Sequence, residues 1–511
     1  MSGMTTLAAE VSAFRLVGNI FGTSNIVWSS IIGLILLYLS IGYYIGGTLA
    51  DKVPSTKKYF NLICWAAFTT SLIPLISRPI LLYAATALAA LEAPIVAGAF
   101  AGIMLIFAIP ITLLGCISPF AIRLLTTQTT ESGSVAGRVY ALSTIGSILG
   151  SFLPVLVTIP LIGTRYTYLI FSGALLLTSL IAIWRHSPKQ NINKTMWMCL
   201  AFVITTYLCS QGNIRPIDGL IHEKESSYNL IQVVQRNQTR YLLLNEAQGI
   251  HSVYDPRSLY TGGSWDYFLS IPFFNKPPYS PSQVENIVVI GLAAGTISNQ
   301  YTSVYGNIPI IGIEIDEDIL DAGRKYFNMA SSNLSTITAD GRLALRHLPD
   351  KYSIIAVDAY RLPYIPWHLT TQEFFIETKS RLTKTGVLAI NVGRTDTDRR
   401  LVDALSATLL TVYPSVHVID VPNTFNSILV ATVSPTSQDN LKENRNILPS
   451  NTHPLLQTML QKSIENLVQT TPSNTIFTDD RAPVEQLTDS ILLRYLLNSK
   501  SEPLPSTNPD L

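Results

Sequence analysis

The hydrophobic pattern of the chain changes near residue 210. Before that point, apolar residues form runs of roughly 20 residues, the length that a helix needs to cross a bilayer. These runs are Ile26–Ala50, Tyr59–Ser77, Pro94–Ile117, Tyr140–Ile162, Tyr166–Trp184 and Met196–Cys209. Two further segments, Met1–Ile20 and Ile80–Leu91, are ambiguous, and the second could be interfacial, re-entrant or a further span. The pattern therefore predicts a helical membrane domain over residues 1–212 with about six to eight spans.

The loops of this domain carry clustered basic residues. Lys52, Lys57 and Lys58 share one loop, Arg123 and Arg138 a second, and Arg185, Lys189 and Lys194 a third. Basic loops favour the cytoplasm. Six spans would then place the rest of the chain outside, whereas one more span would place it inside, so the pattern leaves the side of the soluble part open.

After residue 212 short alternating runs replace the long ones. Tyr228–Val234, Thr239–Leu244 and Gly249–Tyr254 alternate apolar and polar residues, which predicts a small antiparallel β-sheet within residues 213–272. The segment Pro272–Pro281 contains four prolines and predicts a linker to the next domain.

Residues 273–511 alternate strand and helix patterns, as a doubly wound parallel sheet does. The strands are Ile287–Ile290, one that ends near Asp316, then Ser353–Val357, Gly386–Val392 and Val416–Val421, and Ser427–Val433 is expected to add an antiparallel edge. The tail segments Pro454–Val468 and Pro483–Leu497 have helical spacing.

Chemistry-bearing residues follow several of these strands. Gly291 and Gly295 bracket a turn directly after the first strand, and Glu314 lies about 20 residues further on, which suits a ribose diol at the mouth of a parallel sheet. Asp340, followed by Gly341, and Asp358 also come at strand ends. Each acid alone could be a helix N-cap, but together they predict a nucleoside site.

The amino-acid composition agrees with a division into a membrane part and a soluble part, and it limits the kinds of partner that we expect. Only 14% of the 511 residues are charged, against about 25% in soluble domains, and the mean hydropathy is +0.31. The net charge of +1 gives no reason to expect a nucleic-acid partner. The cysteines and histidines lack metal-ligand spacing, so we expect no bound metal.

From Ser227 to about Val433 the chain resembles the spermidine synthase (polyamine aminopropyltransferase) family, and the whole resembles its membrane-fused bacterial members. The segments Ser118–Arg123 and Thr478–Glu485 fit those members too. The resemblance implies a β-sheet domain followed by a Rossmann-like domain of the class I methyltransferase type. It also implies decarboxylated S-adenosylmethionine as cosubstrate, no tightly bound cofactor, an amine acceptor and a possible homodimer. A cosubstrate of this kind favours the cytoplasmic side of the cell membrane.

The resemblance also assigns roles to residues. Gly291 and Gly295 match the glycine loop, Glu314 the acid that holds the ribose, and Asp340 with Gly341 the acid that contacts adenine. Asp358 matches the proton-accepting aspartate: an amine that attacks the carbon next to a sulfonium must lose a proton, and a nearby carboxylate can take it. Asn229 stands where the family has a nucleoside-contacting glutamine, and Trp265-Asp266-Tyr267 replaces the aromatic-polar-acid triplet of the family's β-sheet domain.

The chain departs from the family at two amine-reading positions. Ala294 replaces the aspartate of the glycine loop, and Arg361 replaces an acid three residues after Asp358. A guanidinium would repel a diammonium substrate. We therefore expect a retained nucleoside pocket and an altered acceptor pocket, in which Arg361 meets a carboxylate of the acceptor or of intact S-adenosylmethionine, unless it points to solvent or pairs with Glu373. Asp266, Asp479 or Asp480 could supply a replacement amine site.

Three functions fit these observations. The first is a membrane-bound aminopropyltransferase that acts on an amine. The second is an S-adenosylmethionine-dependent methyltransferase on a membrane-near acceptor, since one fold serves many reactions. The third is a transporter or sensor whose soluble part binds a nucleoside or polyamine. The resemblance favours the first, with the lipid bilayer, the nucleoside and the acceptor as partners.

Overall fold

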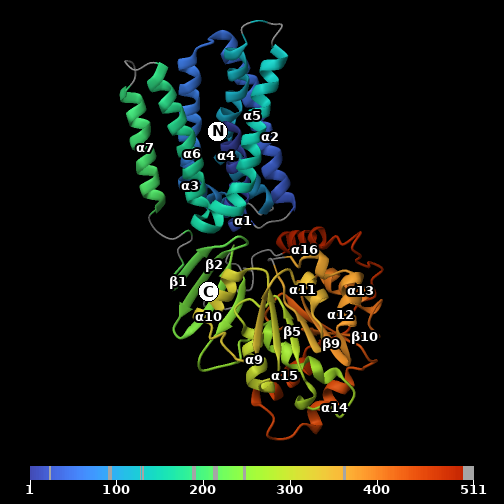
Figure 1. Ribbon diagram of the computed structural model, residues 1–511. Coiled ribbons are helices and arrows are strands. Elements are labelled where there is room, and N and C mark those ends of the chain that lie inside the picture. Colours follow the sequence, from blue (N-terminus) through green and yellow to red (C-terminus); the bar gives the residue numbers. More distant parts are fainter. Residues whose placement is uncertain are drawn as a thin grey trace. The chain divides into compact units, whose positions relative to one another are not determined.

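The computed structural model describes residues 1–498 except 22–24, 90–94, 127, 129–131, 187–191, 211–213, 215–216, 246–248 and 361–363. The chain forms two compact units (Figure 1). The first unit comprises Met1–Pro216 with Glu225–Leu230, and the second comprises Ile217–Lys224 with Ile231–Leu511.

The first unit is helical. Its helices are α1 (Ser2–Phe21), α2 (Asn25–Lys52), α3 (Thr56–Ala89), α4 (Ile95–Leu125), α5 (Ser132–Leu153), α6 (Ile159–His186) and α7 (Ile192–Ser210), with a π-helical turn at Pro154–Thr158. Four helical stretches of the described residues are long and apolar enough to cross a membrane: Asn25–Lys52, Thr56–Ala84, Ala97–Leu125 and Ser132–Arg185. The ambiguous segment at Ile80 continues α3 as far as Ala89.

The longest of these stretches contains a break. Ser132–Arg185 has 54 residues, and as one straight helix it would be about 80 Å long, against a hydrocarbon core of about 30 Å. Gly163 interrupts it with φ 83° and ψ 170°, a backbone conformation that favours glycine. The two predicted runs that meet near this residue therefore form separate helical segments, and Figure 1 shows α5 and α6 as two helices.

Close packing of the helices depends on small residues. A Cβ on Gly46 of α2 would lie 2.5 Å from the Cα of Cys116 on α4, and one on Gly150 of α5 would lie 2.1 Å from the carbonyl oxygen of Met4 on α1. Such contacts hold helices together where lipid offers no hydrophobic drive. The ambiguous N-terminal segment is accordingly a packed helix, with Ala9, Ala13 and Val17 buried.

The second unit begins with a small antiparallel sheet. Its strands lie in the order β1 (Leu220–Glu225), β2 (Leu230–Arg236), β3 (Thr239–Leu244) and β4 (Ile250–Tyr254). The sheet shares a core with the α/β part, because Ile231 and Leu242 pack with Ala294, Ile319 and Phe327.

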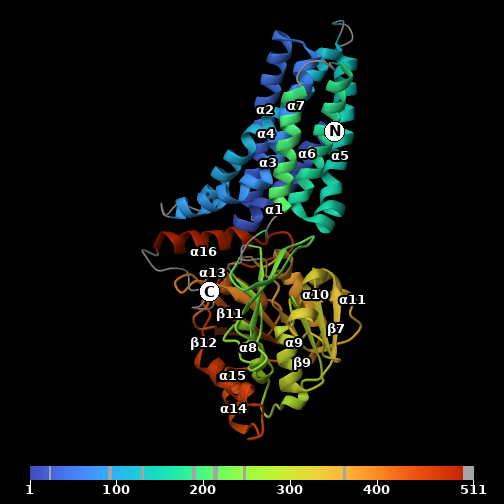
Figure 2. The same cartoon turned by 90° about the vertical axis from the view of Figure 1, so that its left-hand side faces the viewer.

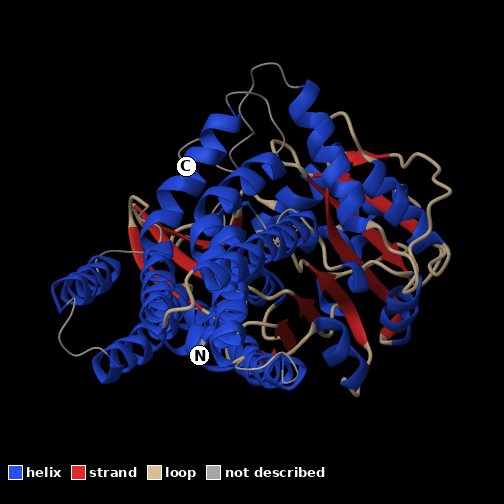
Figure 3. Cartoon of the chain, turned by 90° about the horizontal axis from the view of Figure 1, so that it is seen from above, coloured by secondary structure: helices blue, strands red, loops and turns tan. Residues whose placement is uncertain are grey.

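The α/β part is built on an eight-stranded sheet in the order β12-β10-β11-β9-β8-β5-β6-β7 (red in Figure 3). The strands are β5 (Ile287–Ile290), β6 (Ile310–Glu314), β7 (Leu334–Thr338), β8 (Tyr352–Val357), β9 (Leu382–Gly393), β10 (Ser415–Asp420), β11 (Asn426–Thr432) and β12 (Leu467–Val468). The strands β5 to β9 pair in parallel, and β11 is antiparallel to both β9 and β10. This is the Rossmann-like class I methyltransferase arrangement, so the predicted fold class is confirmed.

Helices connect the strands, and two apolar cores lie against the sheet. The helices are α8 (Ser264–Tyr267), α9 (Thr296–Tyr305), α10 (Glu317–Tyr326), α11 (Gly341–His347), α12 (Gln372–Ser380), α13 (Arg400–Leu410), α14 (Asp439–Ile447), α15 (Pro454–Glu465) and α16 (Val484–Asn498). Figure 2 shows α14 and α15 side by side, and they pack on the segment Phe268–Phe274.

Two sequence predictions are wrong in this unit. Ser427–Val433 is not an edge, because β11 lies between β9 and β10 and is buried along most of its length. The segment that begins at Pro272 is not a simple linker either. Phe268–Phe274 forms a buried 3-10 helix, since its phenylalanines fill the core beneath the sheet.

Candidate active site

The predicted site residues come together at one edge of the large sheet. Gly291 directly follows β5, Asp358 follows β8 on one side of it, and Glu314 ends β6 on the other. The carboxyl ends of parallel strands share an edge, and the order of the strands reverses between β5 and β8, which opens a crevice there. Neighbouring strands are about 4.8 Å apart, so the strand ends that carry Asp358 and Glu314 are roughly 10 Å apart.

The glycine turn allows the end of β8 to approach β5. Gly291 has φ 83°, and a Cβ on it would lie 2.6 Å from the carbonyl oxygen of Asp358 and 2.7 Å from the Cα of Ala359. The amide of Asp358 donates to the carbonyl of Ile290 at 2.9 Å. At the other end of the turn, Gly295 has φ 88° and begins α9. The two glycines thus place the Asp358 carboxylate beside the turn.

Glu314 is tied to the same turn by backbone amides. Its Oε2 accepts from the amide of Ala293 at 2.9 Å, and its Oε1 accepts from the amides of Ile315 at 2.9 Å and Asp316 at 3.3 Å. The side chain is buried, and this burial raises its pKa to about 7 although the amides oppose the shift. The carboxylate is therefore held in one orientation before any ligand binds.

Asp340 lies two residues beyond β7 and caps α11. Its Oδ1 accepts from the amide of Leu343 at 3.0 Å, and its Oδ2 lies 2.8 Å from Nε2 of His368. Burial raises its pKa, but the Leu343 amide and His368 outweigh that effect and hold the pKa below its usual value. A Cβ on Gly341 would lie 2.3 Å from Cγ2 of Ile290, so this glycine lets α11 start against β5. His368 was not anticipated from the sequence.

Asp358 is the acid with the most distinctive surroundings. Its Oδ1 accepts from Nδ2 of Asn391 at 2.8 Å, and the side chain of Trp265 also favours the ionised form of the carboxyl group. Burial raises its pKa to about 7, against the lowering effect of Asn391 and Trp265. A carboxylate with a pKa near neutrality is suited to accept a proton in catalysis.

Asn391 is a site residue that sequence reasoning missed. It lies buried on β9, its Nδ2 also contacts Oγ of Ser264, and its Oδ1 is a buried oxygen without a hydrogen-bond partner among the described residues. An unpaired buried polar atom beside a carboxylate is typical of a functional site. The sequence feature that could have indicated Asn391 is its position as the one polar side chain in the apolar run Val387–Val392.

Asp266 stabilises the loop that precedes Trp265. Its buried carboxylate accepts from the amide of Gly262 at 2.8 Å, from Oγ1 of Thr261 at 2.9 Å and from Nε2 of Gln300 at 2.5 Å. These donors close the loop that leads into α8, the short helix that carries Trp265.

The remaining candidate acids are Asp479 and Asp480, and the two departures from the family are Ala294 and Arg361. Both carboxylate oxygens of Asp479 bind the guanidinium of Arg342, at 2.7 and 2.8 Å, whereas Asp480 is exposed. Ala294 is buried, and its amide donates to Oγ of Ser252 at 2.9 Å. Arg361 lies outside the described residues.

Asn229 is grouped with the first unit, in the segment Glu225–Leu230. Its amide donates to Oγ of Ser226 at 2.8 Å, and its carbonyl accepts from the amide of Ser226 at 2.8 Å. The predicted nucleoside contact of its side chain stays a prediction.

Known proteins that are similar in sequence match about half of this chain. The "Probable polyamine aminopropyl transferase" of Bifidobacterium longum (strain NCC 2705) is 29% identical over 287 residues, covering 53% of this chain and 62% of that protein. The "Polyamine aminopropyltransferase" of Vibrio vulnificus (strain CMCP6) is 28% identical over 254 residues, covering 46% of this chain and 79% of that protein. About half of this chain is similar to polyamine aminopropyltransferases. The resemblance drawn from the motifs is therefore confirmed for that half, and no family model matches the chain.

Solved structures show weaker similarity. A "probable spermidine synthase" from Corynebacterium glutamicum ATCC 13032 is 17% identical with a TM-score of 0.39, covering 51% of this chain and 98% of that one. Human methyltransferase-like protein 13 is 20% identical with a TM-score of 0.32, covering 42% of this chain and 96% of that one. Similarity at this level carries no functional information. The strand order of the sheet identifies the fold independently of it.

Proposed function

We propose that the second unit is an aminopropyltransferase that moves the aminopropyl group of decarboxylated S-adenosylmethionine to an amine. The names of the sequence relatives support this proposal, and the observation that carries it is the environment of Asp358. A carboxylate with a pKa of about 7 stands at the end of β8, beside the glycine turn, and accepts a hydrogen bond from the side chain of Asn391.

The nucleoside would bind across the ends of β5, β6 and β7. Glu314, already oriented by the amides of the turn, would accept hydrogen bonds from the ribose hydroxyls. Asp340 and the start of α11 would contact the adenine. A nucleoside is long enough to reach from these acids toward Asp358, since the strand ends are spaced by about 4.8 Å each.

Asp358 would then act as the proton acceptor. The amine nitrogen forms a bond to the carbon next to the sulfonium while the carbon–sulfur bond breaks, and the bonding pair stays on sulfur as a neutral thioether. The proton lost by the nitrogen passes to the Asp358 carboxylate. The sulfonium is a good leaving group, so orientation of the two substrates supplies much of the remaining acceleration.

Asn391 and Trp265 would hold that carboxylate in place. Asn391 donates to it and restricts its rotation, and both residues favour its ionised form. We infer that they are positioning residues, and that the free Oδ1 of Asn391 would accept from the attacking amine or another donor of the bound substrates.

The acceptor differs from a simple diamine in this proposal. Asp266 and Asp479 already bind donors of the protein, and Arg361 is a cation at the position where the family has an acid. An acceptor that carries a carboxylate besides its amine would therefore suit Arg361. Comparing the turnover of amines with and without a carboxylate tests this part of the proposal.

The helical unit would place the enzyme at a membrane. Four helical stretches of suitable length and composition support this. Extraction of membranes at high pH tests it: an integral protein stays with the lipid, whereas a peripheral protein is released.

The activity itself is tested with the purified full chain in detergent. Decarboxylated S-adenosylmethionine and a panel of amines should yield amines heavier by one aminopropyl group. Amines heavier by a methyl group, formed from intact S-adenosylmethionine, would favour a methyltransferase instead. Nucleoside binding without any product, unchanged by Asp358→Asn, would favour a sensor or transporter.

A further inference from the structure

A segment near the C-terminus, residues 477–481, is bound to the start of α12, although the two are about a hundred residues apart in the sequence. The amide of Gln372 donates to the carbonyl oxygen of Phe477 at 2.8 Å. Oγ1 of Thr371 donates to Oδ1 of Asp479 at 2.7 Å. These contacts hold the Asp479 carboxylate beside the start of α12.

Asp479 binds the guanidinium of Arg342, which lies in the first turn of α11. Its two oxygens accept from Nη1 and Nη2 at 2.7 and 2.8 Å. Glu377 of α12 binds the same guanidinium, with Oε1 accepting from Nη2 at 2.7 Å and Oε2 from Nε at 3.1 Å. The Arg342 side chain is only 8% exposed. Paired hydrogen bonds to carboxylates fix the plane of a guanidinium, so Arg342 is held in one orientation.

Arg342 in turn holds His368, and His368 holds Asp340. Nη1 of Arg342 donates to the carbonyl oxygen of His368 at 3.1 Å, and Nε2 of His368 lies 2.8 Å from Oδ2 of Asp340. The Asp340 pKa lies below its usual value, so near neutral pH this carboxylate is ionised and only accepts, and Nε2 of His368 carries the hydrogen. Asp340 comes two residues before Arg342 in the chain. The contacts therefore form a closed ring around the start of α11.

This ring holds the Asp340 carboxylate at both oxygens and still leaves it free to bind a ligand. Oδ1 accepts from the amide of Leu343, and Oδ2 accepts from His368. An ionised carboxylate offers about four acceptor positions, so others remain for the 6-amino group of adenine. A 6-oxo purine has an acceptor in place of that amino group. A site built to receive a donor rejects an analogue that lacks it, provided that the site is held in place.

We propose that Asp479 and His368 are positioning residues for the selection of the base. Asp479 fixes the guanidinium of Arg342, Arg342 fixes the backbone of His368, and the His368 ring orients the Asp340 carboxylate for the 6-amino group of adenine. This role rests on the proposed nucleoside site, but not on the reaction of the bound nucleoside. It differs from the amine-binding role that the sequence left open for Asp479.

The test is calorimetric titration of the full chain in detergent with 5′-methylthioadenosine, the thioether nucleoside of the proposed reaction, and with its 6-oxo analogue 5′-methylthioinosine. We expect the unmodified chain to prefer the adenine nucleoside. Asp479→Asn and His368→Phe should each reduce the ratio of the two dissociation constants about tenfold, because supporting contacts keep a site in its productive geometry. The double variant should lose no more than the larger single loss, since both changes act on one series of contacts.

The matched control is Asp439→Asn, which removes an exposed aspartate that is paired with Lys442 on α14. The ratio of two dissociation constants does not depend on the fraction of folded protein, because both nucleosides bind the same folded population. A lower stability of a variant therefore leaves the ratio unchanged.

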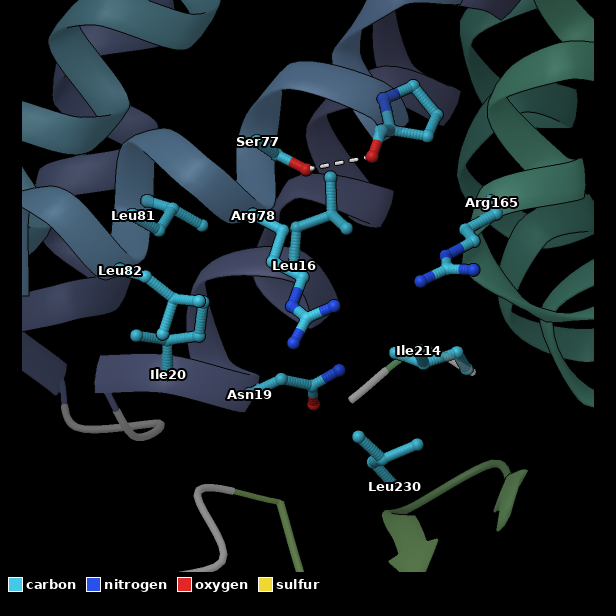
Figure 4. Close-up of a pocket in the computed structure, with 11 residues that line it drawn as sticks. Leu16, Asn19, Ile20, Ser77, Arg78, Leu81, Leu82, Arg165, Ile214 and Leu230 are labelled. Carbon is cyan, nitrogen blue, oxygen red and sulfur yellow. Dashed lines mark hydrogen bonds between the residues drawn. The ribbon is translucent and has the colours of Figure 1, made fainter. Parts of the chain in front are cut away.

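A pocket of the helical unit does not compete for the nucleoside in this titration. It lies between α1, α3 and α6, with Leu16, Leu81 and Leu82 in its lining (Figure 4). Its cavity measures about 60 Å³, whereas small-molecule sites measure about 300–1,000 Å³. We therefore assign nucleoside binding by the full chain to the second unit.

The possible results separate the role of Asp479 from the proposed function. If both single variants keep the ratio of the control, the positioning role is overturned and the nucleoside site stands. Equal affinity of the unmodified chain for the two nucleosides, or none for either, overturns the adenine contact and the positioning role together. If Asp479→Asn does not fold, His368→Phe decides, since it leaves the ion pairs of Arg342 in place. Base selection without an aminopropylated product would contradict the proposed reaction alone.

Discussion

Nδ2 of Asn391 lies 2.8 Å from Oδ1 of Asp358, and this contact joins the ends of two neighbouring strands, β9 and β8. The amide favours the ionised carboxylate, while burial favours the neutral acid. The balance leaves the Asp358 pKa at about 7, where small changes in its surroundings alter the fraction that can accept a proton.

Removing the carboxylate tests its role. In Asp358→Asn we expect kcat to fall by about 100- to 10,000-fold, the usual contribution of a general base, with nucleoside affinity nearly unchanged. Steady-state kinetics and calorimetric titration of the nucleoside measure the two quantities. The matched control is Asp439→Asn, which changes an exposed aspartate at the start of α14. Equal kcat values for Asp358→Asn and the unmodified chain would contradict the assignment.

The same variant should change how stability depends on pH. The pKa of Asp358 is about 7 in the folded chain and near 4 when unfolded, so the folded state binds more protons between these values. The contribution of Asp358 to stability is thus greatest below pH 4 and declines as the pH rises to about 7. Denaturant unfolding at pH 5 and pH 8 should show the Asn variant gaining stability relative to the unmodified chain at the higher pH. A constant difference would argue against the raised pKa.

The pH profile of the reaction tests Asn391. The proton acceptor must be ionised, so kcat/KM should rise with pH through about 7. In Asn391→Ala one stabilising donor is lost, and the profile should move to higher pH with kcat reduced by about tenfold. A purely structural role would lower kcat without moving the profile.

Glu314 and its neighbour Glu317 offer a matched pair. Glu314 accepts three backbone hydrogen bonds at the site, whereas Glu317 is exposed in the first turn of α10. Glu314→Gln should weaken nucleoside binding by about ten- to a hundredfold, since charged hydrogen bonds are each worth about 1.5–3 kcal/mol. Glu317→Gln should leave the affinity unchanged. Equal effects of the two changes would remove Glu314 from the site.

Substitutions of Gly291 and Gly306 distinguish the stability cost of a steric clash from the cost of backbone strain. Both have positive φ, 83° and 80°, but a Cβ on Gly306 would meet nothing within 4 Å, whereas one on Gly291 would lie 2.6 Å from the Asp358 carbonyl oxygen. Gly306→Ala should cost about 1–3 kcal/mol of unfolding free energy, because its φ 80° and ψ −162° lie in a region essentially confined to glycine. Gly291→Ala should cost about 1–3 kcal/mol more than Gly306→Ala, because overpacking is added. Chemical denaturation of both variants measures the difference in unfolding free energy. Equal losses would mean that the turn after β5 can shift to make room for the added methyl group.

The sequence predicts what depends on local pattern. The strands Ile287–Ile290 and Thr239–Leu244 have the predicted bounds, because their apolar runs end at clear turn residues. The acids Glu314, Asp340 and Asp358 could also be placed at strand ends, since each follows or ends its strand closely in the chain.

Features that depend on contacts between residues far apart in the sequence were not predicted. Asn391 meets Asp358 across 33 residues of sequence, and nothing in its local pattern marks the partner. The insertion of β11 between β9 and β10 is likewise decided by pairing, not by its own apolar residues. Pro272 suggested a linker, yet the phenylalanines around it are drawn into the core.

The central claim is that Asp358 accepts the proton of an amine attacking a nucleoside sulfonium. The most direct measurement is mass-spectrometric analysis of products formed by the purified full chain from decarboxylated S-adenosylmethionine and an amine panel that includes amines bearing a carboxylate. We predict an aminopropylated amine and an equal amount of the thioether nucleoside, both lost in Asp358→Asn. Equal product from that variant, or methylated product in place of aminopropylated product, would contradict it.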